Sequence, residues 1–159
     1  MSREFTKKQI KAWIKIINDK CIGSRGCLRN VWIKDGYLTL TNGFILVAYK
    51  VNVKYISPNF IPLDTLKTIN DKRVSFDFLL NKSINVHDKT FFGSYPEFLE
   101  LIPRTIDSYK HSVKLNPKIL GLLCDCFDES ITLEPIVRDD KPLYFTNDYG
   151  DFAIVCGMK

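Results

Sequence analysis

A pattern of one helix followed by several short strands occurs three times along the chain, with a period of about 50 residues. Each helical stretch has apolar residues at the 3.6-residue period, and the stretches after it are short apolar or alternating runs bounded by turn residues. Helices and sheets each bury an apolar face, so such units pack as antiparallel sheets with helices on one face. The sequence therefore predicts an α+β fold of about three helix-plus-strands units.

The first unit opens with a regular helical pattern over residues 6–19. Thr6 is a suitable N-cap. Four apolar residues then recur at the spacing of one helix face: Ile10, Trp13, Ile14 and Ile17. Strands are predicted at Leu28–Lys34, Tyr37–Thr41 and Phe44–Val51. The dipeptides Asp35-Gly36 and Asn42-Gly43 separate these strands, and both are strong tight-turn signals.

The second and third units repeat this order. The second begins with a helix near residues 61–69, with Pro62 near its start, and its predicted strands are Arg73–Phe78, Ser83–His87 and Thr90–Phe92. The third has a helix capped by Asn116 with Pro117 at its first position. Its predicted strands are Ser112–Leu115, Ser130–Val137, Leu143–Thr146 and Phe152–Cys156. We expect a domain of two units at residues 1–105 and a half domain of one unit at residues 106–159.

Positive charge is concentrated in the first third of the chain. Residues 1–57 hold 11 Lys and Arg against 3 Asp and Glu, whereas residues 58–159 hold 12 against 15. Four lysines share the face of the first helix opposite its apolar residues: Lys7, Lys8, Lys11 and Lys15. Clustered cations indicate a polyanionic partner, most often nucleic acid, and a merely solvated basic face is the competing interpretation.

Residues suited to catalysis or metal binding are scarce. The two histidines, His87 and His111, have no partner at a useful spacing, and no nucleophile, phosphate-loop or metallopeptidase motif occurs. The cysteines number five, an odd count, and Cys124-Asp-Cys126 lacks zinc-knuckle spacing. We predict a protein that is not an enzyme and has no metal or other cofactor. Without a membrane-length apolar run or a signal-peptide core, we expect a cytoplasmic protein with no membrane partner.

Four short segments resemble motifs of one family, in the same order along the chain. Residues 38–47 are similar to a hairpin of the bacterial sliding clamp, the beta subunit of DNA polymerase III, and residues 61–63 to the start of its next helix. Residues 93–103 resemble the motif that ends the middle domain of that family, and residues 154–159 resemble its terminus. The resemblance implies a DNA-clamp-like fold over residues 6–159, in a shortened form that keeps the middle domain and the last half of the third.

The resemblance also implies a hydrophobic groove in which clients insert a short peptide with Leu and Phe anchors. Carried over by position, the groove residues are Thr41, Gly43, Phe44, Ile45, Leu46, Pro96, Leu101, Ile154, Cys156, Gly157 and Met158. Two departures from the family pattern affect this groove. Ile45 stands where the family hairpin usually has Arg, and Cys156-Gly157 replaces Met-Pro.

Three functional interpretations remain open. In the first, the chain is a sliding clamp (a processivity factor for DNA replication) that binds DNA polymerase or other clamp-binding proteins and encircles duplex DNA as an oligomer. The lysine stripe would then contact phosphates without sequence specificity. In the second, a clamp fragment without a ring, of a kind that would suit a phage, acts as a decoy or adaptor for clamp-binding proteins. In the third, the basic helix alone binds DNA.

Overall fold

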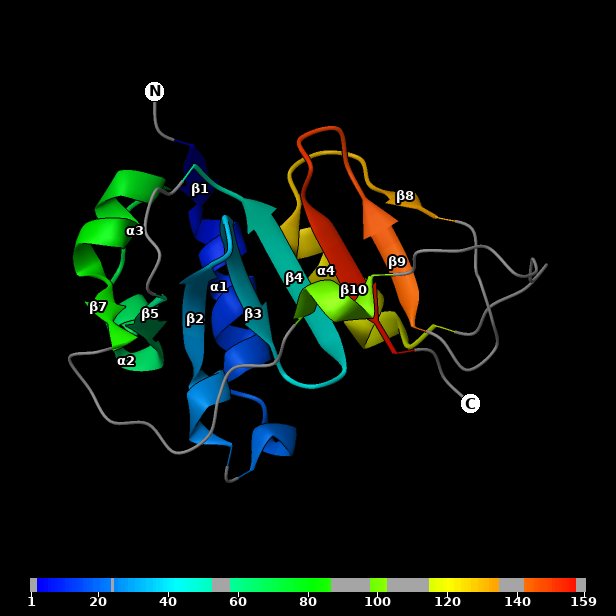
Figure 1. Ribbon diagram of the computed structural model, residues 1–159, viewed down its shortest axis with the longest axis horizontal. Helices are drawn as coiled ribbons and strands as arrows, with labels where there is room; N and C mark the ends of the chain where they lie inside the picture. Colours follow the sequence, from blue (N-terminus) through cyan, green and yellow to red (C-terminus); the bar gives the residue numbers. More distant parts are fainter. Residues whose placement is uncertain are drawn as a thin grey trace.

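An antiparallel sheet, with strands in the order β7-β5-β2-β3-β4-β10-β9-β8, organises the protein in the computed structural model (Figure 1). The structure describes residues 3–23, 25–52, 58–86, 98–102, 115–134 and 142–156. The strands of the sheet are β2 (Asn30–Lys34), β3 (Tyr37–Thr41), β4 (Ile45–Lys50), β5 (Asn59–Pro62), β7 (Ile84–Asn85), β8 (Thr132–Leu133), β9 (Leu143–Thr146) and β10 (Phe152–Val155). A separate antiparallel pair joins β1 (Glu4–Thr6) to β6 (Arg73–Ser75).

The α-helices of the described residues all pack on one face of this sheet. They are α1 (Lys7–Ile17), α2 (Leu63–Lys67), α3 (Phe76–Lys82) and α4 (Pro117–Cys126). Their buried side chains belong to a single apolar cluster, and Figure 1 shows α1 and α4 behind the strands. Three short 3-10 helices contribute to a second cluster on the opposite face: η1 (Lys20–Ile22), η2 (Gly26–Arg29) and η4 (Phe98–Leu101). The α+β class with helices on one face of antiparallel sheet is thus confirmed.

Strand β4 shows why the sequences of the central strands are apolar at nearly every position. Ile45, Val47 and Tyr49 point to the helix side, whereas Leu46 and Ala48 point to the opposite cluster. Successive side chains of a strand alternate between faces. A strand whose two faces are both covered therefore needs apolar residues at every position.

The predicted β2–β3 turn and the predicted cap of α1 are both present in the structure. Asp35 and Gly36 have φ values of 54° and 82°, so both residues of the β2–β3 turn take the left-handed conformation of a type I′ turn. At the start of α1, the Thr6 hydroxyl accepts from the Gln9 N–H, and the Gln9 amide oxygen accepts from the Thr6 N–H. This reciprocal capping box satisfies two N–H groups that the helix itself leaves open.

The strand predicted at Arg73–Phe78 is wrong in its second half. Only Arg73–Ser75 is extended, and α3 begins at Phe76. Ser75 is the N-cap: its hydroxyl accepts the Phe78 N–H at 3.0 Å, which favours helix over strand from that point. The sequence signal for this helix start is a serine followed by an acidic residue, Asp77, in the first turn of the helix.

The other outer strands are shorter than predicted or lie outside the described residues. Within the predicted strand Ser83–His87, the observed strand is β7, and residue 87 is undescribed. Within the predicted strand Ser130–Val137, the observed strand is β8, and residues 135–137 are undescribed. The strand predicted at Thr90–Phe92 and residues 112–114 of the strand before α4 also lie outside the description.

Across the sheet, the three units stand in the order second, first, third. Strand β4 of the first unit pairs with β10 of the third, and β2 pairs with β5 of the second. The helices of the first and third units also lie side by side, because α1 packs against α4. The third unit is therefore joined to the first by both sheet and helix. The division at residue 105 stays a prediction.

A buried polar network joins α1, β4 and the end of α4. The indole N–H of Trp13 donates to the Tyr49 hydroxyl at 2.9 Å, and that hydroxyl donates to the Cys126 carbonyl at 2.6 Å. The Gln9 side-chain amide donates to the same carbonyl at 3.0 Å. These bonds satisfy a carbonyl at the end of α4, where the helix supplies no partner.

Replacing Tyr49 by phenylalanine is expected to lower the free energy of unfolding by about 1–3 kcal/mol, because the buried Trp13 N–H loses its acceptor. Burial raises the pKa of Tyr49 well above 10.0. The neutral phenol is therefore favoured by the folded chain. The stability that comes from keeping this phenol neutral is fully present below the pKa of about 10 that tyrosine has in the unfolded chain. It is lost as the pH rises above that value. Urea titrations at rising pH should show a shallower alkaline loss in the variant; equal slopes would contradict this role.

Candidate functional site

The tip of the β3–β4 hairpin is held in one shape by its own side chains. The Asn42 side-chain oxygen accepts the N–H groups of Phe44 at 2.9 Å and Ile45 at 3.0 Å. The Thr41 hydroxyl accepts the Gly43 N–H at 3.0 Å and donates to the Ile45 carbonyl at 2.8 Å. Gly43 has φ of 97°, which glycine adopts without strain. Phe44 projects from this rigid turn with 51% of its surface exposed.

The end of β10 lies directly beside this tip. The Cys156 N–H donates to the Phe44 carbonyl at 2.9 Å, and the exposed Cys156 sulfur lies 3.9 Å from the Gly43 carbonyl oxygen. Two residue pairs further along, Ile154 is the register partner of Leu46. The structure thus brings the predicted hairpin residues together with the predicted chain-end residues, although more than 100 positions separate them.

The predicted groove residues do not all face the same side of the sheet. Leu46 and Ile154 are buried in the cluster opposite the helices. Ile45 is buried on the helix side, where Val155, its partner in β10, also packs. Thr41 is buried as well, so Gly43, Phe44 and Cys156 are the exposed described members of the set.

The short helix η4 covers the sheet face on which Leu46 and Ile154 lie. It is the lime-green turn in front of β10 in Figure 1. Its Phe98 is buried, with ring centroids 5.9 Å from Tyr37 and 6.1 Å from Phe152. Leu101 ends η4, but its side chain is outside the described residues, as are Pro96, Gly157 and Met158.

The predicted lysine stripe lies on the outer side of α1. Lys8, Lys11 and Lys15 are exposed and Lys7 is half-buried, whereas Trp13 on the opposite side has no exposed surface. The Lys8 ammonium lies 3.5 Å from the Asp125 carboxylate of α4. An acidic residue of the third unit therefore borders the stripe on one side.

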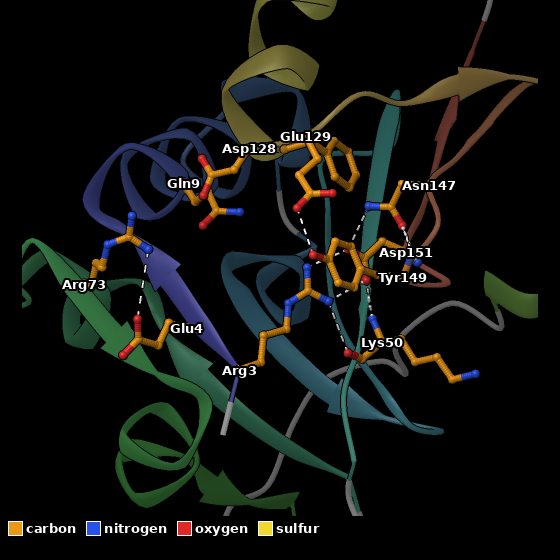
Figure 2. Close-up of a pocket in the computed structure, with 11 residues that line it drawn as sticks. Arg3, Glu4, Gln9, Lys50, Arg73, Asp128, Glu129, Asn147, Tyr149 and Asp151 are labelled. Carbon is orange, nitrogen blue, oxygen red and sulfur yellow. Dashed lines mark hydrogen bonds and ion pairs between the residues drawn. The ribbon is translucent and has the colours of Figure 1, made fainter. Parts of the chain in front are cut away.

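A cavity of about 490 Å³ opens where the first and third units meet (Figure 2). Its centre is an ion pair: both guanidinium Nη atoms of Arg3 lie 2.6 Å from the Asp151 carboxylate oxygens. The Asp151 carboxylate also accepts the Lys50 N–H at 2.7 Å and the Asn147 side-chain amide at 3.0 Å. Four hydrogen bonds thus surround a carboxylate that is fully buried.

The aromatic ring of Tyr149 closes one side of this cavity over Arg3. The guanidinium carbon lies 5.7 Å from the ring centroid, and the Tyr149 hydroxyl donates to Glu129 at 2.8 Å. This hydrogen bond raises the pKa of Tyr149. No residue of this cluster is among the site residues predicted from the sequence. No local signal pointed to it, because Arg3 is 148 positions away.

The four cysteines whose side chains the structure describes fall into two chemical classes. Cys27 and Cys126 are buried, whereas Cys124 and Cys156 are exposed. Burial raises the pKa of Cys126 to about 12, so this thiol stays protonated at neutral pH.

Iodoacetamide at pH 8 is expected to modify Cys124 and Cys156 within minutes and to leave Cys27 and Cys126 unmodified until the chain is denatured, because alkylation requires an accessible thiolate. Peptide mass spectrometry measures the four sites separately. Equal labelling of Cys124 and Cys126 in the native protein would contradict the burial of the α4 end.

Two kinds of feature are absent from the described ranges. No group of three or more His, Cys, Asp or Glu side chains there is placed to hold a metal ion. Nor is any helix in those ranges long and apolar enough to cross a membrane.

No protein-family model and no curated protein sequence matches the chain. Among solved structures, the DNA polymerase III beta subunit of Thermotoga maritima is similar, with a TM-score of 0.56 and 14% sequence identity. The structural match covers 100% of this chain and 65% of the Thermotoga maritima chain. The chain therefore has the clamp-like fold that the sequence motifs predicted, in about two thirds of the neighbour's length.

Proposed function

We propose that this chain is a non-enzymatic, sliding-clamp-like protein of DNA replication, which binds short peptides of replication proteins beside the β3–β4 hairpin and duplex DNA along α1. The observation that carries the proposal is the meeting of Phe44 with Cys156 on a clamp-like fold. A rigid turn with an exposed aromatic side chain suits peptide binding, because little conformational entropy is lost when a partner binds it.

The composition of α1 supports the DNA-binding part. Lys7 and Lys8 occupy its first turn, which contains no acidic residue. The N-terminus of a helix carries partial positive charge, so each lysine there destabilises the helix by about 0.3–1 kcal/mol at low ionic strength. A solvated face selected only for solubility would favour acidic residues in this turn. Lysines at these positions are better explained by an anionic partner.

Oligomerisation is the part of the proposal that separates a ring from an adaptor. The described sheet ends at β7 on one side and β8 on the other, and both are two-residue strands. Edge pairing between copies would extend the sheet toward a ring. The adaptor alternative has its own support, since the third unit is packed against the first within one chain.

Light scattering over a concentration series, followed by DNA retention on circular and linearised templates, tests the proposal. A closed oligomer that stays on circular duplex and leaves a linearised one is the expected result for a ring. A monomer or dimer that binds peptides with Leu and Phe anchors would favour the decoy or adaptor instead. Binding of neither peptide nor duplex would overturn both.

A further inference from the structure

The cavity between the first and third units has a buried floor and an exposed rim (Figure 2). Its volume of about 490 Å³ lies within the range of about 300–1,000 Å³ that is typical of small-molecule sites. Asp151 and Gln9 in the floor are 1% and 3% exposed, whereas Asp128 at the rim is exposed. The second unit also contributes to the lining, through Arg73 of β6. Residues of all three units therefore enclose this space.

The floor of the cavity holds hydrogen-bond donors that the protein uses only in part. The Gln9 amide nitrogen carries two N–H groups, and within the described residues it donates to the Cys126 carbonyl alone. Arg3 has five N–H groups. Its Nη atoms bond to Asp151 and to the Lys50 carbonyl, and its Nε has no partner among the described residues. A ligand with a carboxylate would satisfy the remaining donors, because a carboxylate has two acceptor oxygens.

Carboxylates stand on the other side of the cavity. Figure 2 shows Asp128 and Glu129, which follow α4, across from the Arg3 guanidinium. Asp128 has no ion-pair partner among the described residues, and one oxygen of Glu129 accepts the Tyr149 hydroxyl. The Tyr149 ring already holds the guanidinium carbon of Arg3 at 5.7 Å from its centroid. Two carboxylates and an aromatic ring are the surroundings that a cationic group of a ligand requires.

The sum of the lining charges distinguishes between classes of ligand. Among the described residues, four acidic and three basic side chains line the cavity, so the lining carries one net negative charge. A dicarboxylate would add two negative charges to this lining. A polyamine would leave the donors of Arg3 and Gln9 without an acceptor. A molecule with one carboxylate and two cationic groups matches both the donors and the net charge, and a basic α-amino acid is the simplest such molecule.

We propose that this cavity binds a free basic α-amino acid. The carboxylate of the ligand lies at Arg3, Gln9 and Arg73. Its cationic side chain lies at Asp128 and Glu129. The ligand contacts all three units, so its binding stabilises their packing against one another. The inference does not depend on the proposed peptide groove or DNA contacts, because none of the residues assigned to them lines the cavity.

Isothermal titration calorimetry of the full chain with three matched small molecules tests the proposal. L-arginine is the probe, agmatine is the same molecule without the carboxylate, and L-citrulline has an uncharged group in place of the guanidinium. We expect L-arginine to bind at least about tenfold more tightly than either analogue, because each analogue lacks one charge-assisted contact. Thermal unfolding followed by tryptophan fluorescence should have a higher midpoint in excess L-arginine.

Two conservative variants assign the two ends of the ligand. Asp128→Asn should weaken the binding of L-arginine about tenfold and leave the affinity for L-citrulline unchanged. Arg73→Gln should weaken the binding of L-arginine and L-citrulline and leave the affinity for agmatine unchanged. Asp64→Asn on α2 and Lys118→Gln on α4 are the matched controls, because each makes the same change of charge at an exposed position outside the cavity. Both controls should bind L-arginine as the wild-type chain does.

Three results would overturn the proposal. The first is that millimolar L-arginine gives neither a heat of binding nor a higher unfolding midpoint. The second is equal affinity for L-arginine and agmatine, which would show that the acidic rim attracts any cation. The third is an equal loss of affinity in the cavity variants and in their controls. Each of these results would leave the proposed peptide groove and DNA contacts unaffected, since those residues lie outside the cavity.

Discussion

Replacing Arg3 by alanine is expected to lower the free energy of unfolding by about 3–5 kcal/mol, because it leaves the fully buried Asp151 carboxylate without its cation. The Lys50 N–H and the Asn147 amide remain as donors, but neither carries charge. The guanidinium itself is 29% exposed, so the reverse change, Asp151→Asn, should cost less since Arg3 is partly hydrated already. Urea titrations followed by the fluorescence of Trp13 and Trp32, both buried, measure these effects.

A second ion pair in the same cavity provides the control for Arg3. Glu4 and Arg73 are 4.0 Å apart, with side-chain exposures of 58% and 65%. Replacing both by alanine should change stability by less than about 1 kcal/mol, as for most exposed pairs. The double variant Arg3→Ala/Asp151→Ala should cost less than the sum of its single changes, because the two groups interact directly. Additive losses would show that Arg3 and Asp151 contribute independently.

The fold was predictable wherever the determining signals are local. The Asp35-Gly36 turn, the Thr6 cap and the apolar period of α1 each act over a few residues, and the structure has all three. At Ser75 two local signals competed. The apolar residues that follow fit a strand or a helix, and the serine cap favours the helix.

The candidate site was predictable only in part, since its members are distant in the sequence. The order of the motifs indicated that the hairpin and the end of the chain lie side by side. The structure shows this contact as a backbone hydrogen bond between Cys156 and Phe44. Burial of Ile45 on the helix side follows from strand alternation, which a list of motif positions does not take into account. Arg3 reaches Asp151 only through the folded chain, so no spacing rule could have identified this pair.

Charge reversal at Lys11 and Lys15 is expected to weaken duplex binding by about a hundredfold or more at 50 mM salt, if α1 faces DNA. Both side chains are exposed on one face of the helix, so the change should leave packing intact. Each lysine that contacts a phosphate releases a counterion on binding, and its removal lowers both affinity and the steepness of the salt dependence. Titration of a labelled duplex at several salt concentrations measures the two quantities together.

Two controls separate a DNA-binding face from general attraction to a basic protein. Lys20→Glu/Lys82→Glu changes the net charge equally at exposed positions off the stripe, and it should weaken binding several-fold at most. Asp125→Asn frees Lys8 from its acidic neighbour 3.5 Å away and should tighten binding about two- to fivefold. If Asp125→Asn raises the affinity for duplex DNA and Lys11→Glu/Lys15→Glu lowers it, with the fold unchanged, then the DNA phosphates bind at α1. Equal losses in the two charge-reversal variants would instead mean that the lysine stripe is a solvated surface and that DNA is attracted by net charge alone.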